Sequence, residues 1–167
     1  MLRTTRTPHI RKADTARGQD EKRQMMTRLR AERREGIVFK HLSAPSTPGR
    51  PASGGSQLKY KFVSTATVYV AAVNEHRRSV RMSVSSTGLD GVLTDVGSVT
   101  IPPNAEIPPI GALIEVQYLY AYPGGSLYQP VYRGIRDDLN LSACRMTQLK
   151  FKTAPEETGD DDAGNDA

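Results

Sequence analysis

The fold is decided by residues 65–84, which read TATVYVAAVNEHRRSVRMSV. On both sides of residues 74–78, apolar side chains alternate with polar or small ones. Val68 and Val70 carry the pattern before this segment, and Val80 and Met82 carry it after. A period of two is typical of strands that bury one face, so two strands are predicted here.

The same alternation continues downstream. A third strand is predicted over residues 92–101, a fourth over residues 114–122 and a fifth over residues 128–133. Pro and Gly mark the turns between them. Five short strands within roughly 75 residues are typical of an oligonucleotide-binding (OB) barrel. The predicted fold class is therefore mainly β, with one N-terminal helix and a five-stranded OB barrel.

The fourth strand carries three tyrosines on one face. Tyr118, Tyr120 and Tyr122 alternate in phase with Ile114 and Val116. Side chains two residues apart on a strand point to the same side. These tyrosines are therefore predicted to lie mainly in the core rather than on a binding surface.

Composition limits the class of protein. The 167 residues suit one modest domain with tails, since 37% are apolar and there is no tryptophan. There is no run of the ~20 apolar residues that span a bilayer and no secretory signal pattern, so a cytoplasmic protein without a membrane partner is expected. The single cysteine, Cys144, excludes an internal disulfide and is predicted to be a small buried side chain.

Charge is distributed unevenly. Residues 1–40 carry 12 Lys or Arg against 5 Asp or Glu, residues 41–152 carry 11 against 7, and residues 153–167 carry 6 acids and no base. A basic body indicates a polyanionic partner, with nucleic acid first. The basic arm over residues 1–16 and the acidic tail over residues 153–167 are expected to be disordered.

One helix is predicted between the arm and the first motif, from Asp20 to about Arg34. Acidic side chains at its start and arginines at its end suit the helix dipole. Met25, Met26 and Leu29 form a narrow apolar stripe at helical spacing. We interpret the stripe as a packing face.

Two short segments follow the helix, separated by a loop rich in Ser, Pro and Gly. The first reads EGIVFK over residues 35–40, and the second reads LKYKF over residues 58–62. Both are predicted strands. Lys59 and Lys61 share one strand face and can reach a single phosphate group, while Glu35 can hold a divalent metal ion or its water. The alternative is a salt-bridged hairpin with ordinary surface lysines.

A third segment follows the last barrel strand and reads VYRGIRDD over residues 131–138. Arginine can clamp a phosphate with two parallel hydrogen bonds, which lysine cannot do. The alternative is a basic strand end that is capped by acids.

In this order the segments resemble the C-terminal part of an ATP-dependent DNA ligase of the bacterial type, including ligase domains of end-joining proteins. Residues 35–40 are similar to motif IV of that family, residues 58–62 to motif V and residues 133–138 to motif VI. The resemblance runs over about residues 20–152. It also includes TPGRP with a following GG, VGSVTIPPN, and a YPGG turn, at residues 47–55, 96–104 and 122–125.

The resemblance implies a domain organisation. Residues 17–62 would be the end of a nucleotidyltransferase domain, an ATP-grasp-like ligase segment, and residues 63–152 would be the OB domain. It also implies ATP and Mg²⁺ as cofactors.

Roles for single residues follow from the same resemblance. Glu35 would bind the Mg²⁺ ion. Lys59 and Lys61 would contact the phosphates of ATP or of the adenylate. Arg136, as a further cofactor-binding residue, and Asp138 would help to orient the leaving pyrophosphate when the OB domain closes.

The chain departs from the family pattern at two places. Leu139 stands where motif VI normally has lysine. The nucleophile motif Lys-x-Asp-Gly-x-Arg normally lies far upstream of motif IV, whereas 34 residues precede Glu35 here. Residues 12–17 imitate that motif with Thr15 in place of glycine, but a polar arm supplies no desolvation to activate Lys12. A truncated or split ligase that cannot adenylate itself alone is therefore expected.

Two classes of function remain. The first is a truncated or split ATP-dependent DNA ligase that joins nicks in repair and recombination, on nicked or double-stranded DNA, with a second chain supplying the missing lobe. The second is a non-catalytic OB-fold DNA-binding module, which contacts the DNA backbone through Arg77, Arg78 and Arg81 together with the lysines of motif V, and weakens with salt. A decayed remnant without function is a third alternative.

Overall fold

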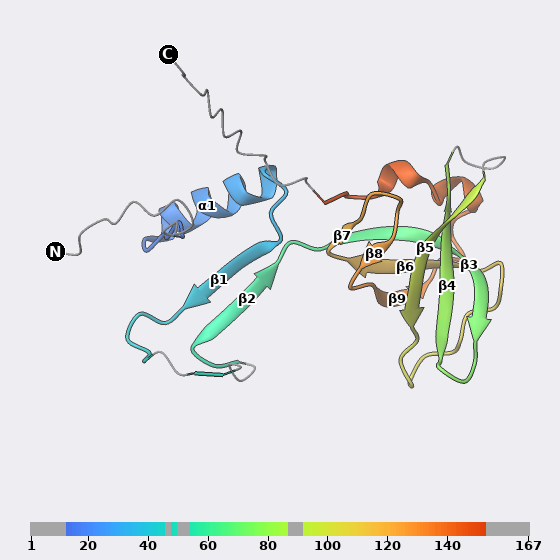
Figure 1. Cartoon of the computed structure of the whole chain (residues 1–167), viewed down its shortest axis with the longest axis horizontal. Helices are drawn as coiled ribbons and strands as arrows, with labels where there is room; N and C mark the ends of the chain where they lie inside the picture. Colours follow the sequence, from blue (N-terminus) through green and yellow to red (C-terminus); the bar gives the residue numbers. More distant parts are fainter. Residues whose placement is uncertain (1–12, 46–47, 50–53, 87–91, 153–167) are drawn as a thin grey trace, which may run out of the picture.

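The structure, a computed structural model, describes four stretches of the chain: residues 13–45, 48–49, 54–86 and 92–152. Most of the predicted arm, Lys12, most of the TPGRP stretch and the acidic tail lie outside the described residues. Figure 1 shows two units side by side, a helix with a β-hairpin and a β-barrel. No helix within these stretches combines the length and apolar character needed to cross a membrane.

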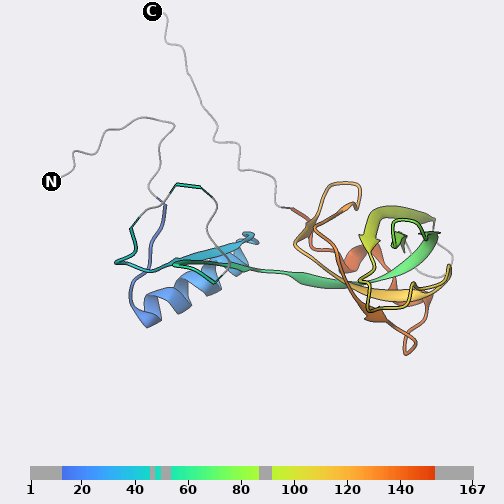
Figure 2. The same cartoon turned by 90° about the horizontal axis from the view of Figure 1, so that it is seen from below.

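The first unit, called the hairpin unit, consists of α1 (Gln19–Ala31), β1 (Gly36–Lys40) and β2 (Gln57–Lys61). The helix lies against one face of the hairpin (Figure 2). The two strands are antiparallel, with Gly36 opposite Lys61. A methyl group on Gly36 would lie 2.1 Å from the carbonyl oxygen of Tyr60. Glycine at the second position of the EGIVFK segment therefore allows the two strands to pair.

The helix ends three residues before the predicted Arg34. The backbone of Arg33 is left-handed, with φ of 55°. The N–H of Arg33 donates to the carbonyl of Arg30 at 3.0 Å, and the N–H of Arg34 donates to that of Leu29 at 2.9 Å. This pair of bonds is the Schellman motif, which usually has glycine at the left-handed position. Because arginine occupies it here, the sequence contains no residue that marks the end.

The second unit is the barrel. Its five main strands follow the order β5-β4-β3-β6-β9 with antiparallel neighbours, and β5 also contacts β9, so that the sheet closes. The predicted OB barrel is confirmed. The strands are β3 (Ser64–Asn74), β4 (Ser79–Ser85), β5 (Leu93–Thr100), β6 (Leu113–Tyr118) and β9 (Val131–Ile135). Smaller elements complete the unit: β7 (Tyr120–Ala121), β8 (Leu127–Tyr128) and the 3₁₀ helices η1 (Leu141–Ala143) and η2 (Met146–Gln148).

The core follows the period-two pattern. Val68, Val70, Val80 and Met82 are all fully buried, as the alternation predicts. Cys144 is also buried, and burial raises the pKa of its thiol to about 11. It is the small buried side chain that the sequence predicts.

Two strand predictions were wrong in their bounds. The strand predicted over residues 58–62 ends at Lys61, and Phe62 and Val63 lie outside strands. The chain between β2 and β3 crosses from one unit to the other (Figure 2). The predicted strand over residues 114–122 is interrupted at Leu119, which separates β6 from β7. Tyr118 and Tyr120 are in the core as predicted, but Tyr122 is 38% exposed, because the interruption takes it out of the barrel sheet.

Candidate functional site

The lysines of the second motif lie on one face of the hairpin. Lys59 pairs across the sheet with Val38 and Lys61 with Gly36, and both lysines are exposed. The intervening Tyr60 faces the helix, where its hydroxyl accepts a hydrogen bond from Arg30 at 3.1 Å. Lys59 and Lys61 therefore leave the hairpin on the same side, opposite Tyr60 and α1.

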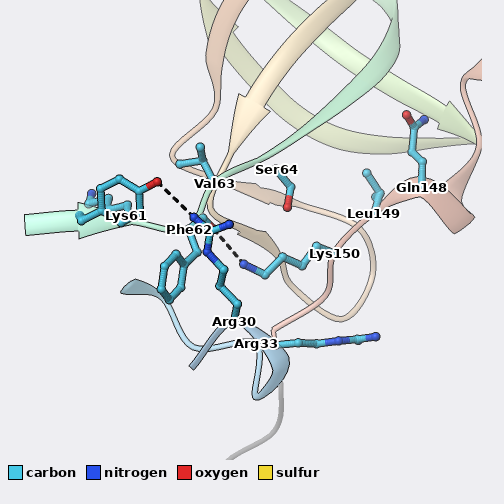
Figure 3. Close-up of a pocket in the computed structure, with 10 residues that line it drawn as sticks. Arg30, Arg33, Lys61, Phe62, Val63, Ser64, Gln148, Leu149 and Lys150 are labelled. Carbon is cyan, nitrogen blue, oxygen red and sulfur yellow. Dashed lines mark hydrogen bonds between the residues drawn. The ribbon is translucent and has the colours of Figure 1, made fainter. Parts of the chain in front are cut away.

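A cavity of about 450 Å³ lies where the hairpin unit meets the barrel (Figure 3). We call it the junction cavity. The hairpin unit contributes Arg30, Arg33 and Lys61 to its lining, and the barrel contributes Gln148 and Lys150. Four cationic residues therefore line one cavity, and they come from three segments that are far apart in the sequence.

Two hydrogen bonds and one ring contact hold the units together here. The Lys61 Nζ donates to the Gln129 Oε1 at 2.7 Å, and the Lys150 Nζ donates to the Phe62 carbonyl oxygen at 2.9 Å. The guanidinium carbon of Arg30 lies 5.0 Å from the centroid of the Phe62 ring, within the range of a cation–π contact. In each of these contacts a cationic side chain interacts with a neutral group.

The electrostatics of the cavity act most clearly on Lys150. Its partial burial lowers the pKa of the ammonium group, and repulsion by Arg33 lowers it further. The carboxylate of Glu35 acts in the opposite direction, which places this acid near the same opening. An anion that entered the cavity would relieve the repulsion between the two cations.

Glu35 is the predicted Mg²⁺ ligand. Its side chain is exposed, and its carbonyl oxygen accepts a hydrogen bond from the Phe62 N–H at 2.9 Å. No group of three or more His, Cys, Asp or Glu side chains that could hold a metal ion occurs among the described residues. Mg²⁺ often binds through one or two carboxylates plus substrate phosphates and water. Glu35 fits such a shared site as one ligand, and does not by itself form a complete protein cage.

The third motif lies at the other end of the barrel. Arg136 binds both oxygens of Asp138, at 2.8 and 2.9 Å, which lowers the pKa of the carboxyl group. The backbone of Arg136 donates to the carbonyl of Leu113, where β6 begins, whereas Ser64 pairs with Tyr118, where β6 ends. Five strand residues separate these points, about 17 Å. The structure therefore does not bring Arg136 and Asp138 together with Glu35, Lys59 and Lys61.

The three arginines predicted to bind DNA have different surroundings. Arg77 is exposed in the turn between β3 and β4. Arg78 donates to the carbonyl oxygens of Pro102 and Ala105, at 3.0 and 2.6 Å, and so holds a neighbouring loop. Arg81 forms an ion pair with Asp95 across the β4–β5 ladder. Arg77 is the one whose charge is most available to an external ligand.

An aromatic cluster lies close to the junction cavity. The rings of Tyr120 and Tyr128 are stacked with centroids 4.8 Å apart, and Tyr122 meets both rings edge-on. The Lys152 Nζ lies 5.3 Å from the Tyr120 ring centroid. The hydrogen bond with Tyr122, followed by burial, raises the pKa of Tyr120. The exposed Tyr122 ring lies 5.9 Å from the Lys152 Nζ, and an exposed aromatic ring beside a lysine is a combination that OB-fold proteins use for bases and phosphates.

The sequence did not reveal that Arg30, Arg33 and Lys150 line one cavity, or that Gln129 accepts a hydrogen bond from Lys61. One signal was available. Residues 149–152 read LKFK, which nearly repeats the LKYK of residues 58–61. The structure places both segments at the junction cavity.

Comparison with known proteins supports the fold. No protein-family model matches the chain, and a search of curated proteins finds no significant match. Among solved structures, a Lig E DNA ligase, studied for DNA binding with a minimal scaffold, is similar with a TM-score of 0.54. The identity is 15%, over 74% of this chain and 48% of that one. The chain therefore shares its fold with about half of that protein.

Two further ligases match with lower TM-scores. The ligase domain of M. tuberculosis LigD gives 0.40 at 22% identity, over 73% of this chain and 50% of that one. A mycobacterial DNA ligase D complexed with ATP and MES gives 0.37 at 20% identity, over 78% and 51%. The chain thus spans about half the length of each of these three DNA ligases.

Proposed function

We propose that the chain is a ligase-related protein that acts on nicked or double-stranded DNA with ATP. The observation that carries the proposal is the placement of Lys59 and Lys61 on one face of a hairpin that is joined directly to an OB barrel. The fold similarity to the Lig E DNA ligase supports it. Residues 17–62 would be the end of the nucleotidyltransferase domain and residues 63–152 the OB domain.

The parent reaction transfers AMP from a lysine to the 5′-phosphate of a nick. The 3′-hydroxyl then attacks that phosphate, a phosphodiester bond forms and AMP leaves. Lys59 and Lys61 would neutralise the phosphate charge that these steps place beside them. Glu35 would supply one oxygen to the Mg²⁺ ion, which when bound polarises the phosphate.

Arg136 and Asp138 lie away from the motif V lysines, so their proposed role requires a movement of the barrel. They are paired with each other at the far end of the barrel. Contact with the leaving pyrophosphate would require the barrel to turn relative to the hairpin unit, which is the closure that the resemblance implies. Such closure would change the contacts at the junction, where Lys61 is bonded to Gln129 and Lys150 to the Phe62 carbonyl.

The adenylation step would need a lysine that these 167 residues do not provide in a recognisable motif. We propose that a second chain supplies it with the rest of the nucleotidyltransferase lobe. A cavity of about 820 Å³ beside α1 combines apolar residues such as Met25, Leu29 and Ile37 with charged residues and with residues 13–17 of the chain itself, and such a lobe would pack against its apolar part once residues 13–17 moved aside.

Intact-mass analysis after incubation with ATP and Mg²⁺ tests this assignment. We expect no covalent AMP on the 167-residue polypeptide. We expect nick sealing only when a polypeptide that carries Lys-x-Asp-Gly-x-Arg is added. A covalent AMP that is lost in Lys12→Ala would refute the dependence on a second chain. If adding that polypeptide gave no sealing, the ligase role would be wrong.

A non-catalytic DNA clamp is the second candidate function. The cluster of Tyr120, Tyr122 and Tyr128 beside Lys152 favours it, because binding through stacking and phosphate contacts needs no nucleophile. Fluorescence anisotropy with a labelled duplex would show an affinity that falls linearly on a log–log salt plot. Binding without sealing in the presence of the second polypeptide would select this function. We place either activity in DNA repair or recombination in the cytoplasm.

A further inference from the structure

The junction cavity carries more positive charge than the contacts between the two units require. Arg30, Arg33, Lys61 and Lys150 line it. Among the ion pairs of the described residues none involves any of these four side chains. Their neighbour Arg34, in contrast, is paired with a carboxylate.

The hydrogen-bond partners of the cavity cations are all neutral. Arg30 donates to the Tyr60 hydroxyl, Lys61 to the Gln129 amide and Lys150 to the Phe62 carbonyl. The side chain of Arg33 has no hydrogen bond or ion pair within the described ranges. These cations form no ion pair with Glu35, although its carboxylate acts on Lys150, so an anion in the cavity would be favoured by all four charges.

We propose that the junction cavity binds one phosphate group of a DNA backbone that crosses from the hairpin unit to the barrel. This inference rests on the proposed DNA-binding function. Arginine supplies directional donors and lysine a compact charge, and the two together suit a tetrahedral oxyanion. The lowered pKa of Lys150 agrees with this assignment, because its main causes, burial and Arg33, are both offset by a bound anion.

The lining favours a backbone phosphate over a free nucleotide. A nucleotide would need an aromatic or apolar surface for its base. The two rings at the cavity are those of Tyr60 and Phe62, and the Arg30 guanidinium lies over both, at 6.0 and 5.0 Å. Phe62 is also buried. The cavity therefore offers a phosphate site without a platform for adenine.

Arg33 and Lys150 are suitable for substitution. Arg33→Gln removes a charge that has no ion pair or hydrogen bond within the part of the chain that the structure describes. Lys150→Gln removes the charge and keeps an amide donor for the Phe62 carbonyl, and Lys150→Arg keeps the charge. The matched control is the double variant Arg23→Gln with Arg145→Gln, which removes the same charge from two exposed positions outside the cavity.

The assay is fluorescence anisotropy of a labelled 20-base-pair nicked duplex, with each protein measured over 50 to 300 mM KCl. Each phosphate that a protein neutralises contributes about 0.9 to the slope of log affinity against log salt. We expect the Arg33→Gln/Lys150→Gln variant to lose about 0.9 of slope, the value for one shared phosphate. Two separate phosphates would give a loss of about 1.8.

The affinity in 100 mM KCl should fall roughly 10-fold in this variant and less than about 2-fold in the control. Lys150→Arg should stay within about 2-fold of the wild type, because it keeps the charge. Circular-dichroism melting verifies that each variant is folded. A slope and affinity equal to those of the control would refute the phosphate site. A loss of about 1.8 in the salt slope would refute the proposal that Arg33 and Lys150 share one phosphate.

Two further measurements distinguish failure of the phosphate site from failure of the proposed DNA-binding function. If the wild-type protein did not bind the duplex in 50 mM KCl, the proposed DNA-binding function would be wrong. ATP and inorganic phosphate are titrated separately by calorimetry. Submillimolar ATP binding that disappears in the Arg33→Gln/Lys150→Gln variant would assign the cavity to a nucleotide and overturn the DNA assignment.

Discussion

Replacing Tyr118 by phenylalanine removes one buried oxygen atom and tests how the C-terminal segment is held on the barrel. The Tyr118 side chain is 0% exposed. Its hydroxyl oxygen accepts a hydrogen bond from the backbone N–H of Lys150 at 2.8 Å. Phenylalanine keeps the ring and its packing, so the effect should come from the amide that loses its acceptor.

The expected cost follows from the burial of that amide. An unpaired buried donor costs about 1 to 3 kcal/mol. The bond is only partly buried, so we expect the lower part of this range, about 1 to 2 kcal/mol. With an m-value of about 1.5 kcal/mol/M, the urea midpoint should fall by about 1 M.

Urea unfolding followed by far-UV circular dichroism measures this difference, and Tyr69→Phe is the matched control. Tyr69 is half-buried on β3, and its hydroxyl has no hydrogen bond within the described ranges, so its loss should change the free energy of unfolding by less than about 0.5 kcal/mol. Hydrogen exchange of the Lys150 amide should accelerate in Tyr118→Phe. Equal urea midpoints for the two variants would refute the reasoning.

The pH dependence supplies a second check on Tyr118. Burial raises the pKa of the hydroxyl above its usual 10.0, although the Lys150 N–H opposes the shift. The neutral form is therefore favoured in the folded state. The resulting stabilisation is complete below pH 10.0 and is lost as the pH rises through the folded pKa. The stability difference between the wild type and Tyr118→Phe should narrow in that alkaline range.

Three other perturbations test separate features. Arg78→Ala should lower the free energy of unfolding by about 1.5 to 3 kcal/mol, because the Arg78 side chain donates hydrogen bonds to two loop carbonyls. Arg77 is exposed, so Arg77→Ala should change the free energy of unfolding by less than about 0.5 kcal/mol. Urea unfolding measures both differences. Gly36→Ala would put a methyl group 2.1 Å from the Tyr60 carbonyl oxygen. Amides of β1 and β2 should therefore lose protection from hydrogen exchange, while those of β3–β6 keep it. Retained protection in the hairpin would contradict this expectation. The Cys144 thiol, with its pKa raised from 9.0 to about 11, should react with a disulfide reagent at pH 8 about 100-fold more slowly in the folded state than in urea, and the stability that this shift reflects should decline as the pH rises from 9 to 11.

The barrel could be read from local patterns. A strand that buries one face needs an apolar residue at every second position, so Val68, Val70, Val80 and Met82 were sufficient to predict strands and core together. The burial of Cys144 followed from the absence of any motif around it. Lys59 and Lys61 share a face because they are two residues apart on a strand. These properties depend on neighbours within a few residues.

The local patterns were less informative about where elements end. Arg33 adopts a left-handed backbone that glycine usually provides, so nothing in the sequence marked the end of α1. The alternation through Tyr122 continued beyond the point where the barrel sheet ends at Tyr118. Both features depend on the packing of the chain beyond the element itself.

The junction cavity was decided by the tertiary structure alone. The Lys61–Gln129 bond joins residues 68 positions apart, and the Lys150–Phe62 bond joins residues 88 positions apart. Charge counts predicted a basic protein, but they could not separate Arg78, which holds a loop, from Arg33, which forms no ion pair with any other described residue. The sequence alone determined the strands, the faces of their side chains and the overall sign of the charge, because these depend on short-range periodicity and composition. The meeting of Arg30, Arg33, Lys61 and Lys150 around one opening depends on how the barrel closes and where the hairpin docks, which only long-range packing determines.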